Sequence, residues 1–343
     1  MNAGSLRGNR EWLVALLLAW FAAASCGSGG SSWGPCVGPD PKAAYGTWYW
    51  DGSAWVRQSQ KTVPGPLVYD AGTKQVLAYD SSPQDIQGLW EFSRADWTFV
   101  SRPPSTPMPD VSGGVDAYIA YDSANENLML FQCASKSSCQ TWTWRGATWR
   151  LHPSVVDPGY LSGASVAYDE VRKEVVLFGG SDYVQGQSQA TWTWDGTTWT
   201  LQHPDNSPPS RTGAGMAFDR AHAQMVLYGG STNQFPTGPL SDTWTWDGKT
   251  WAQQHPSASP PAQSQVSLLP AGTAMTYDNV SGQVVAVVDV GSTTQTWTWD
   301  GQLWSEQVQT VNPPGGGQAT YDSENREVVL AAGYPGCVYM NLP

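Results

Sequence analysis

Charged residues are scarce in this chain of 343 residues, at 13%, and lysine and arginine (17) are outnumbered by aspartate and glutamate (29). The formal net charge of −12 and the lack of a basic cluster predict repulsion from phosphate backbones, so nucleic acid is not expected as a partner. No apolar run is long enough to cross a bilayer. No phosphate-binding glycine loop, H-E-x-x-H, C-x-x-C or G-x-S-x-G occurs, so no local motif predicts a catalytic residue, a metal or a cofactor.

The longest apolar run, WLVALLLAWFAAA at residues 12–24, follows two arginines and closely precedes Cys26. As a helix it spans about 20 Å, short of a hydrocarbon core of about 30 Å, so we predict a signal peptide over residues 1–25. The segment AASC resembles the lipobox of bacterial lipoproteins, although Ala23 stands where that family usually has leucine. The resemblance implies a lipidated Cys26, a flexible linker over residues 26–44 and a place in the cell envelope. Ordinary cleavage, giving a secreted soluble protein, is the alternative.

Tryptophan is abundant, and seventeen of its twenty copies fall in a repeated nonapeptide, T-W-T-W-D-G-x-x-W. The six copies lie near fifty residues apart: TWYWDGSAW from Thr47, LWEFSRADW from Leu89, TWTWRGATW from Thr141, TWTWDGTTW from Thr191, TWTWDGKTW from Thr243 and TWTWDGQLW from Thr296. A second unit alternates with it, an aromatic residue followed by aspartate, a short turn and an apolar strand. This period is that of a propeller blade.

Each unit predicts four short antiparallel strands. Trp244 and Trp246, two residues apart, share one strand face, so we expect such indoles to fill the gaps between blades. The first nonapeptide has no Y-D unit before it, and the last Y-D unit, Tyr321-Asp322, has no nonapeptide after it. We therefore predict an all-β protein, a six-bladed β-propeller over residues 45–338 whose last blade is closed by N- and C-terminal strands.

The five cysteines are an odd number for an exported chain, which agrees with a separate role for Cys26. Cys133 and Cys139 flank a five-residue loop between neighbouring strands. Cys36 and Cys337 lie near the chain ends, which a closed propeller brings together. We predict the disulfides Cys133–Cys139 and Cys36–Cys337.

The double glycine after the second strand, at 179–180 and 229–230, the aromatic third strand and PPSRTG at 208–213 resemble kelch-repeat proteins and the propeller domain of the galactose oxidase type. The resemblance covers residues from about 45 to 335 and implies the fold, mostly used as a binding platform. Four units depart from it, with Tyr79-Asp80, Gln132-Cys133, Val288-Asp289 and Ala332-Gly333 at the glycine pair.

Few residues suggest chemistry. An oxidase of this type needs copper held by two histidines and two tyrosines. His152, His203 and His255 end fourth strands in matching contexts, which spreads them around the ring, and His222 lies in a hairpin, so we expect no metal site. We assign turn capping to the aspartate of each Y-D unit. The members are Asp70, Asp122, Asp169, Asp219, Asp278 and Asp322. Asp-Gly pairs, as at Asp51 and Asp247, predict two-residue hairpin turns.

Asp80 and Asp289 replace the second glycine of the pattern in two non-adjacent blades. As a hypothesis, they form a ligand-binding face with the longer loops that start at Ser181 and Ser231, because propellers place recognition on such loops. The alternative is that both are exposed loop carboxylates.

We expect a monomeric, exported propeller, tethered to the membrane through its lipid alone, that binds a protein or a glycan and uses no cofactor. Two alternatives are a carbohydrate-active or copper-type oxidase enzyme, whose residues would be scattered over several blades, and a purely structural envelope protein. Exposed aromatic rings at one end of the propeller would favour a lectin. Tryptophans all buried between blades would favour protein binding or no ligand.

Overall fold

The computed structural model describes residues 46–63, 65–81, 87–103, 116–135, 138–154, 156–182, 185–233, 238–263, 273–290 and 293–332. All of these belong to one compact unit, Ala44–Tyr334. Within the described residues every regular element is a strand, and no helix is present that could cross a membrane. The predicted signal peptide, Cys26, Cys36 and Cys337 lie outside the described residues, so lipidation and the Cys36–Cys337 disulfide stay predictions.

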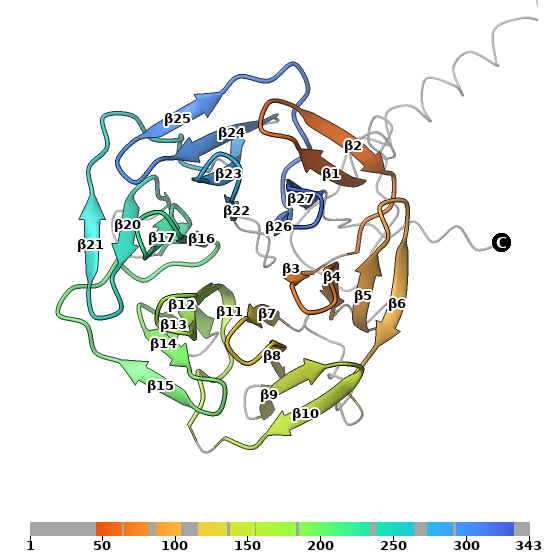
Figure 1. Cartoon of the computed structure of the whole chain (residues 1–343). Coiled ribbons are helices and arrows are strands. Elements are labelled where there is room, and N and C mark those ends of the chain that lie inside the picture. The colour runs from red at the N-terminus through yellow and green to blue at the C-terminus, as the bar shows by residue number, and fades with distance from the viewer. Residues whose placement is uncertain are drawn as a thin grey trace, which may run out of the picture. The chain divides into compact units, whose positions relative to one another are not determined.

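The strands form six four-stranded antiparallel blades arranged in a ring around a common axis, as predicted (Figure 1). From the innermost strand outward, they are as follows. Blade 1 is β26 (Gln318–Asp322), β27 (Glu327–Ala332), β1 (Gly46–Trp50) and β2 (Trp55–Ser59); blade 2 is β3 (Leu67–Asp70), β4 (Gln75–Asp80), β5 (Gly88–Phe92) and β6 (Trp97–Ser101); blade 3 is β7 (Ala117–Asp122), β8 (Asn127–Ser135), β9 (Ser138–Arg145) and β10 (Thr148–His152).

The second half of the ring repeats this order. Blade 4 is β11 (Ser162–Asp169), β12 (Glu174–Asp182), β14 (Thr191–Trp194) and β15 (Trp199–Gln202); blade 5 is β16 (Gly215–Asp219), β17 (Gln224–Tyr228), β20 (Thr243–Trp246) and β21 (Trp251–Gln254); blade 6 is β22 (Ala274–Asp278), β23 (Gln283–Val290), β24 (Thr293–Trp299) and β25 (Trp304–Gln307). Short strands β13 (Gly186–Gln187), β18 (Ser231–Thr232) and β19 (Gly238–Pro239) lie in the connections of blades 4 and 5.

Blade 1 confirms the predicted closure, because β1 from the N-terminal part pairs with β27 from the C-terminal part. Their register places Gly46 opposite Ala332 and Trp50 opposite Val328. The ring is thus joined by backbone hydrogen bonds between segments almost 300 residues apart, and neither β1 nor β27 is left as an open sheet edge.

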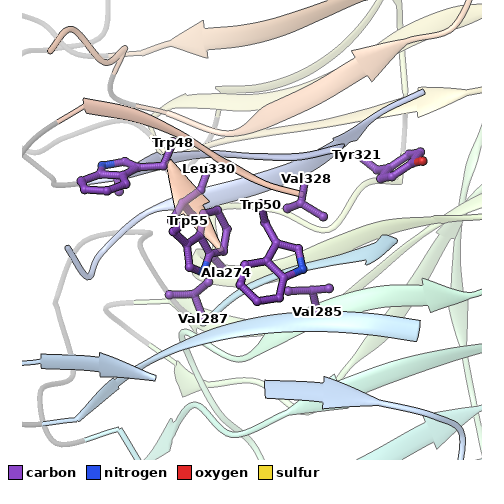
Figure 2. Packing of buried hydrophobic residues seen from close by; sticks show 10 residues of the cluster. Trp48, Trp50, Trp55, Ala274, Val285, Val287, Tyr321, Val328 and Leu330 are labelled. Carbon is purple, nitrogen blue, oxygen red and sulfur yellow. The ribbon is translucent and has the colours of Figure 1, made fainter. Parts of the chain in front are cut away.

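The tryptophans fill the gaps between blades, as predicted. Each of six clusters of buried residues joins two neighbouring blades. At the closure, Trp50 and Trp55 of blade 1 pack with Val285 and Val287 of blade 6 (Figure 2). The largest fully buried side chains include Trp194, Trp246, Trp251 and Trp299.

A repeated hydrogen bond explains why the nonapeptide begins with threonine and ends with tryptophan. The final indole N–H of one blade donates to the first threonine hydroxyl of the preceding blade. The pairs are Trp97–Thr47, Trp199–Thr141, Trp251–Thr191, Trp304–Thr243 and Trp55–Thr296, at 2.8–3.1 Å. In blade 2 the threonine is replaced by Leu89, and Trp149 of blade 3 donates to Ser101 instead. The motif therefore encodes contacts between blades.

The turns between third and fourth strands differ from the predicted two-residue hairpins. Asp247 starts a four-residue turn, in which its N–H donates to the Thr250 carbonyl and its carboxylate accepts the N–H groups of Lys249 and Thr250. Asp51, Asp195 and Asp300 make the same turn. A two-residue turn occurs where Arg145 replaces the aspartate, because the carboxylate that caps the longer turn is missing there.

Candidate functional site

The innermost strands line a channel, and each contributes side chains at fixed positions relative to the aspartate that ends the strand. Three residues before this aspartate, every blade presents an apolar side chain. These six residues, Leu67, Ile119, Val166, Met216, Met275 and Ala319, line both of two cavities on the channel, of about 120 and about 240 Å³. They form an apolar ring at which the linings of the two cavities meet, and we call it the floor.

The larger cavity lies at the end of the propeller where the inner strand turns into the second strand, which we call the hairpin end. We call this cavity the hairpin-end vestibule. An aromatic residue from each blade, directly before the aspartate, lines its walls. These residues are Tyr69, Tyr121, Tyr168, Phe218, Tyr277 and Tyr321. Burial raises the pKa of each of the five tyrosines, and that of Tyr168 reaches about 12, so their hydroxyls stay protonated at neutral pH.

Four of the five tyrosine hydroxyls accept a hydrogen bond from the neighbouring blade. The backbone N–H of Ala124 donates to Tyr168 at 3.1 Å, and the N–H of Gly72 donates to Tyr121 in the same way. Tyr69 and Tyr277 accept the N–H groups of Glu324 and Ala221. Because these hydroxyls are engaged in the preceding hairpin, the aromatic rings themselves line the vestibule.

The rim of the vestibule is asymmetric. It is formed by the residue directly after each aspartate, which differs between the blades. In blades 4 to 6 this position holds Glu170, Arg220 and Asn279, and in blades 1 to 3 it holds Ser323, Ala71 and Ser123. The Arg220 guanidinium donates to Glu170 from Nε at 2.9 Å and from Nη2, and to Asn279 Oδ1 from Nη1 at 3.0 Å. The half of the rim in blades 4 to 6 therefore carries polar side chains joined by hydrogen bonds, and the half in blades 1 to 3 carries small side chains.

The aspartates of the Y-D units cap their hairpins, as predicted. Asp122 accepts the N–H groups of Ala124 and Asn125, and Asp278 accepts that of Val280 at 2.8 Å. All six are buried. Their carboxylates are occupied by their own turns, which leaves recognition to the residues that flank them.

The opposite end of the propeller, the loop end, carries the predicted ligand residues, but they do not lie at equivalent positions. Register places Asp80 at the first glycine position of the family pattern and Asp289 at the second, so the proposed equivalence was wrong by one residue. Their side chains therefore point to opposite faces of their blades. Asp80 is buried, and Asp289 is half-buried and accepts the N–H of Gly316. The two carboxylates belong to blades 2 and 6, which blade 1 separates.

The alternative, two exposed loop carboxylates, does not describe them either. A local steric cause explains why blades 4 and 5 carry glycine at these two positions. Gly179 and Gly230 have φ of 75° and 84°, and a Cβ atom on either would lie 2.7 Å from a backbone carbonyl oxygen. A role of Asp80 and Asp289 in ligand binding stays a prediction.

The longer loops of blades 4 and 5 form added strands at this end. The Gln187 amide joins them, because it donates to the Ser231 carbonyl at 3.1 Å and accepts from the Asn233 N–H at 2.7 Å. In blade 3, the predicted Cys133–Cys139 disulfide is confirmed, and its two cysteines lie opposite each other in the pairing of β8 with β9.

A buried carboxylate directly precedes the inner strand of blade 3. Asp116 accepts hydrogen bonds from the Ser162 side chain and the Gly163 N–H, while its Oδ2 has no partner. Desolvation raises its pKa to about 6.

The histidines lie apart, in three different blades. His152 accepts or donates a 2.9 Å hydrogen bond with Thr143, at the position where Gln202, Gln254 and Gln307 bond the equivalent threonine. It is therefore one residue out of step with His203 and His255, a correction to the matching contexts that the sequence suggested. His222 pairs with Asp219. In the part of the chain that the structure describes, no group of three His, Cys, Asp or Glu side chains is placed to hold a metal ion.

No protein-family model matches the chain, and no curated protein matches it. Among solved structures, it is similar to the structure of YjhT, with a TM-score of 0.51 and 12% identity over 76% of this chain and 89% of the other. It is also similar to the SapL1 lectin in complex with α-methyl fucoside (TM-score 0.51, 13% identity, 76% and 85% covered) and to the Hadza microbial sialidase Hz136 (0.53, 12%, 80% and 65%). Identities this low show a shared fold, and the chain is a six-bladed β-propeller.

Proposed function

We propose that the protein is a glycan-binding module whose site is the hairpin-end vestibule. The observation that carries the proposal is the combination of aromatic walls with a polar half-rim of Glu170, Arg220 and Asn279. Sugars present apolar C–H faces and in-plane hydroxyls, and these match aromatic rings and planar hydrogen-bonding groups. A concave apolar site with a few convergent polar groups is the usual form of a small-ligand pocket.

The size of the vestibule supports a sugar over a protein segment. Its volume of about 240 Å³ lies below the range of roughly 300–1,000 Å³ typical of sites for drug-sized ligands, so it suits one monosaccharide unit. The seventeen tryptophans of the repeat offer no flat exposed patch, because fourteen of them are buried and Trp90, Trp149 and Trp192 are partly buried. The tyrosines of the vestibule take the place that exposed tryptophans would have in a lectin. The lectin and sialidase structures show that proteins of this fold bind or process sugars, which agrees with the proposal.

The resemblance to kelch-repeat proteins, the export and the tether are part of the same proposal. A signal peptide over residues 1–25 and a lipid on Cys26 would hold the propeller at the bacterial envelope, where glycans are abundant. Mass spectrometry of the mature N-terminus tests this part alone: a diacylated or triacylated Cys26 supports it, and an unmodified N-terminus at Ser25 contradicts it.

A glycan array probed with the soluble propeller tests the binding function. Arg220→Gln should weaken binding to the best glycan by about 10- to 100-fold, because it removes a charged donor whose hydrogen bonds contribute about 1.5–3 kcal/mol. Arg326→Gln, an exposed arginine at the same end, is the matched control and should bind like the unaltered protein. Equal binding by all three proteins would refute the vestibule as the site.

A further inference from the structure

The lining of the hairpin-end vestibule ends at the floor, whose six apolar side chains come from all six blades and also line the loop-end cavity. A polymer that occupies the vestibule must therefore enter and leave on the same side. The end of a glycan chain meets this condition with one linkage, whereas an internal residue would need two exits.

The floor also determines which part of the sugar can be buried deepest. It contains no polar side chain, so a hydroxyl placed against it would lose its water without gaining a hydrogen bond. A methyl group has no such cost. Ala319 of blade 1 is the smallest member of the ring, across from Val166 of blade 4, so the floor is least filled by side-chain atoms on its side.

The rim sets the direction in which the chain leaves. The polar half, centred on Arg220 in blade 5, is placed to bond the ring hydroxyls of the bound residue. The half formed by Ser323, Ala71 and Ser123 has short side chains over three adjacent blades, and the next sugar can pass across it without displacing an ion pair.

We infer that the vestibule recognises the terminal residue of a glycan, and that this residue carries a methyl group, at C6 of a 6-deoxyhexose or on an acetamido group, that points to the floor beside Ala319. This inference rests on the proposed glycan-binding function. It adds the position in the chain and the chemical class of the sugar.

The test uses pairs of glycosides that differ by the methyl-bearing group. Isothermal titration and ligand-observed NMR compare methyl L-fucoside with methyl L-galactoside, and methyl N-acetylglucosaminide with methyl glucoside. The preferred methyl-bearing sugar should bind about fourfold more tightly or better, the factor expected for burying one methyl-sized group. A trisaccharide that carries the same residue only at an internal position should not compete.

Two floor variants make the test specific. Ala319→Leu fills the space and should abolish the preference, whereas Ala319→Ser, nearly the same size, offers a hydrogen bond and should shift preference toward the hydroxyl-bearing partner. Val280→Ala, exposed on the same end, is the control and should keep the preference.

Equal binding within both pairs, an unchanged preference in Ala319→Ser, or competition by the internal residue would overturn the inference while leaving glycan binding intact. Failure of all four glycosides and of every glycan on the array would instead overturn the proposed function, and this inference with it.

Discussion

The bond between Trp304 and Thr243 offers a direct test of how neighbouring blades are held together. Both residues are almost fully buried, at 2% and 1% exposed, and the indole N–H lies 2.9 Å from the hydroxyl oxygen. Thr243→Val keeps the shape and removes the acceptor, which leaves the N–H buried and unpaired. Such a group costs about 1–3 kcal/mol, so the melting temperature should fall by about 2–5 °C for a domain of this size.

We expect the loss of stability in Thr243→Val to fall in the lower half of the range of about 1–3 kcal/mol. The buried N–H groups of Trp194, Trp246 and Trp299 already have no partner, so the fold carries some unpaired indoles. A double-mutant cycle isolates the bond: Thr243→Val, Trp304→Phe and the double variant are compared by denaturant unfolding.

The double variant should recover about 1 kcal/mol relative to the sum of the single variants, because Trp304→Phe removes the donor that Thr243→Val leaves unpaired. Thr200→Val, on the exposed face of β15, is the control for the change of residue type and should leave stability almost unchanged. Additive effects, with a coupling energy below about 0.3 kcal/mol, would show that the bond does not couple the blades.

Three further changes test other parts of the fold. Asp116→Asn should raise the unfolding free energy at pH 7.5 by up to about 3 kcal/mol and leave it unchanged at pH 3.5. The reason is that the pKa of Asp116 is raised to about 6 in the fold, so the native protein loses stability as pH rises from about 4 to about 6. A pH series of unfolding curves checks this, and the same pH dependence in both proteins would contradict it. Replacing Cys133 and Cys139 by serine should lower the unfolding free energy by about 2 kcal/mol, measured without reductant, and no loss would contradict it. Ending the chain at Pro314 removes β26 and β27 and should abolish cooperative unfolding, so a soluble, cooperatively folding truncation would refute the closure.

The fold could be predicted from the sequence because its repeats are local and periodic. Two tryptophans two residues apart define a strand face, and the unpaired units at the two ends define the composite blade, as the pairing of β1 with β27 confirms. The role of Thr243 was not predicted, because its partner Trp304 lies in the next unit of the chain. Bonds between repeats become visible only when the blades are placed side by side.

The candidate site could not be predicted in the same way. The repetition of units such as Tyr168-Asp169 draws attention to the aromatic position and the constant aspartate, and both serve the fold. The signal was the position after them, where Glu170 and Arg220 contrast with Ala71 and serine in the other units. Variation at one position of a constant repeat is readable in a sequence, but the contact between Glu170 and Arg220 depends on the ring geometry.

The contrast between a variable rim and constant walls gives a physical reason for a site on the axis of the ring. Six equivalent positions around a channel present identical groups to any ligand unless the repeat is broken, and a small sugar has no sixfold symmetry to match. Placing Glu170, Arg220 and Asn279 on consecutive blades divides the rim into a half that bonds and a half that is open. The aromatic walls and the apolar floor need no such asymmetry, because they select for apolar surface rather than for direction. Under the proposed glycan-binding function, specificity would depend on these three side chains, which lie outside the tryptophan and tyrosine contacts that join the blades.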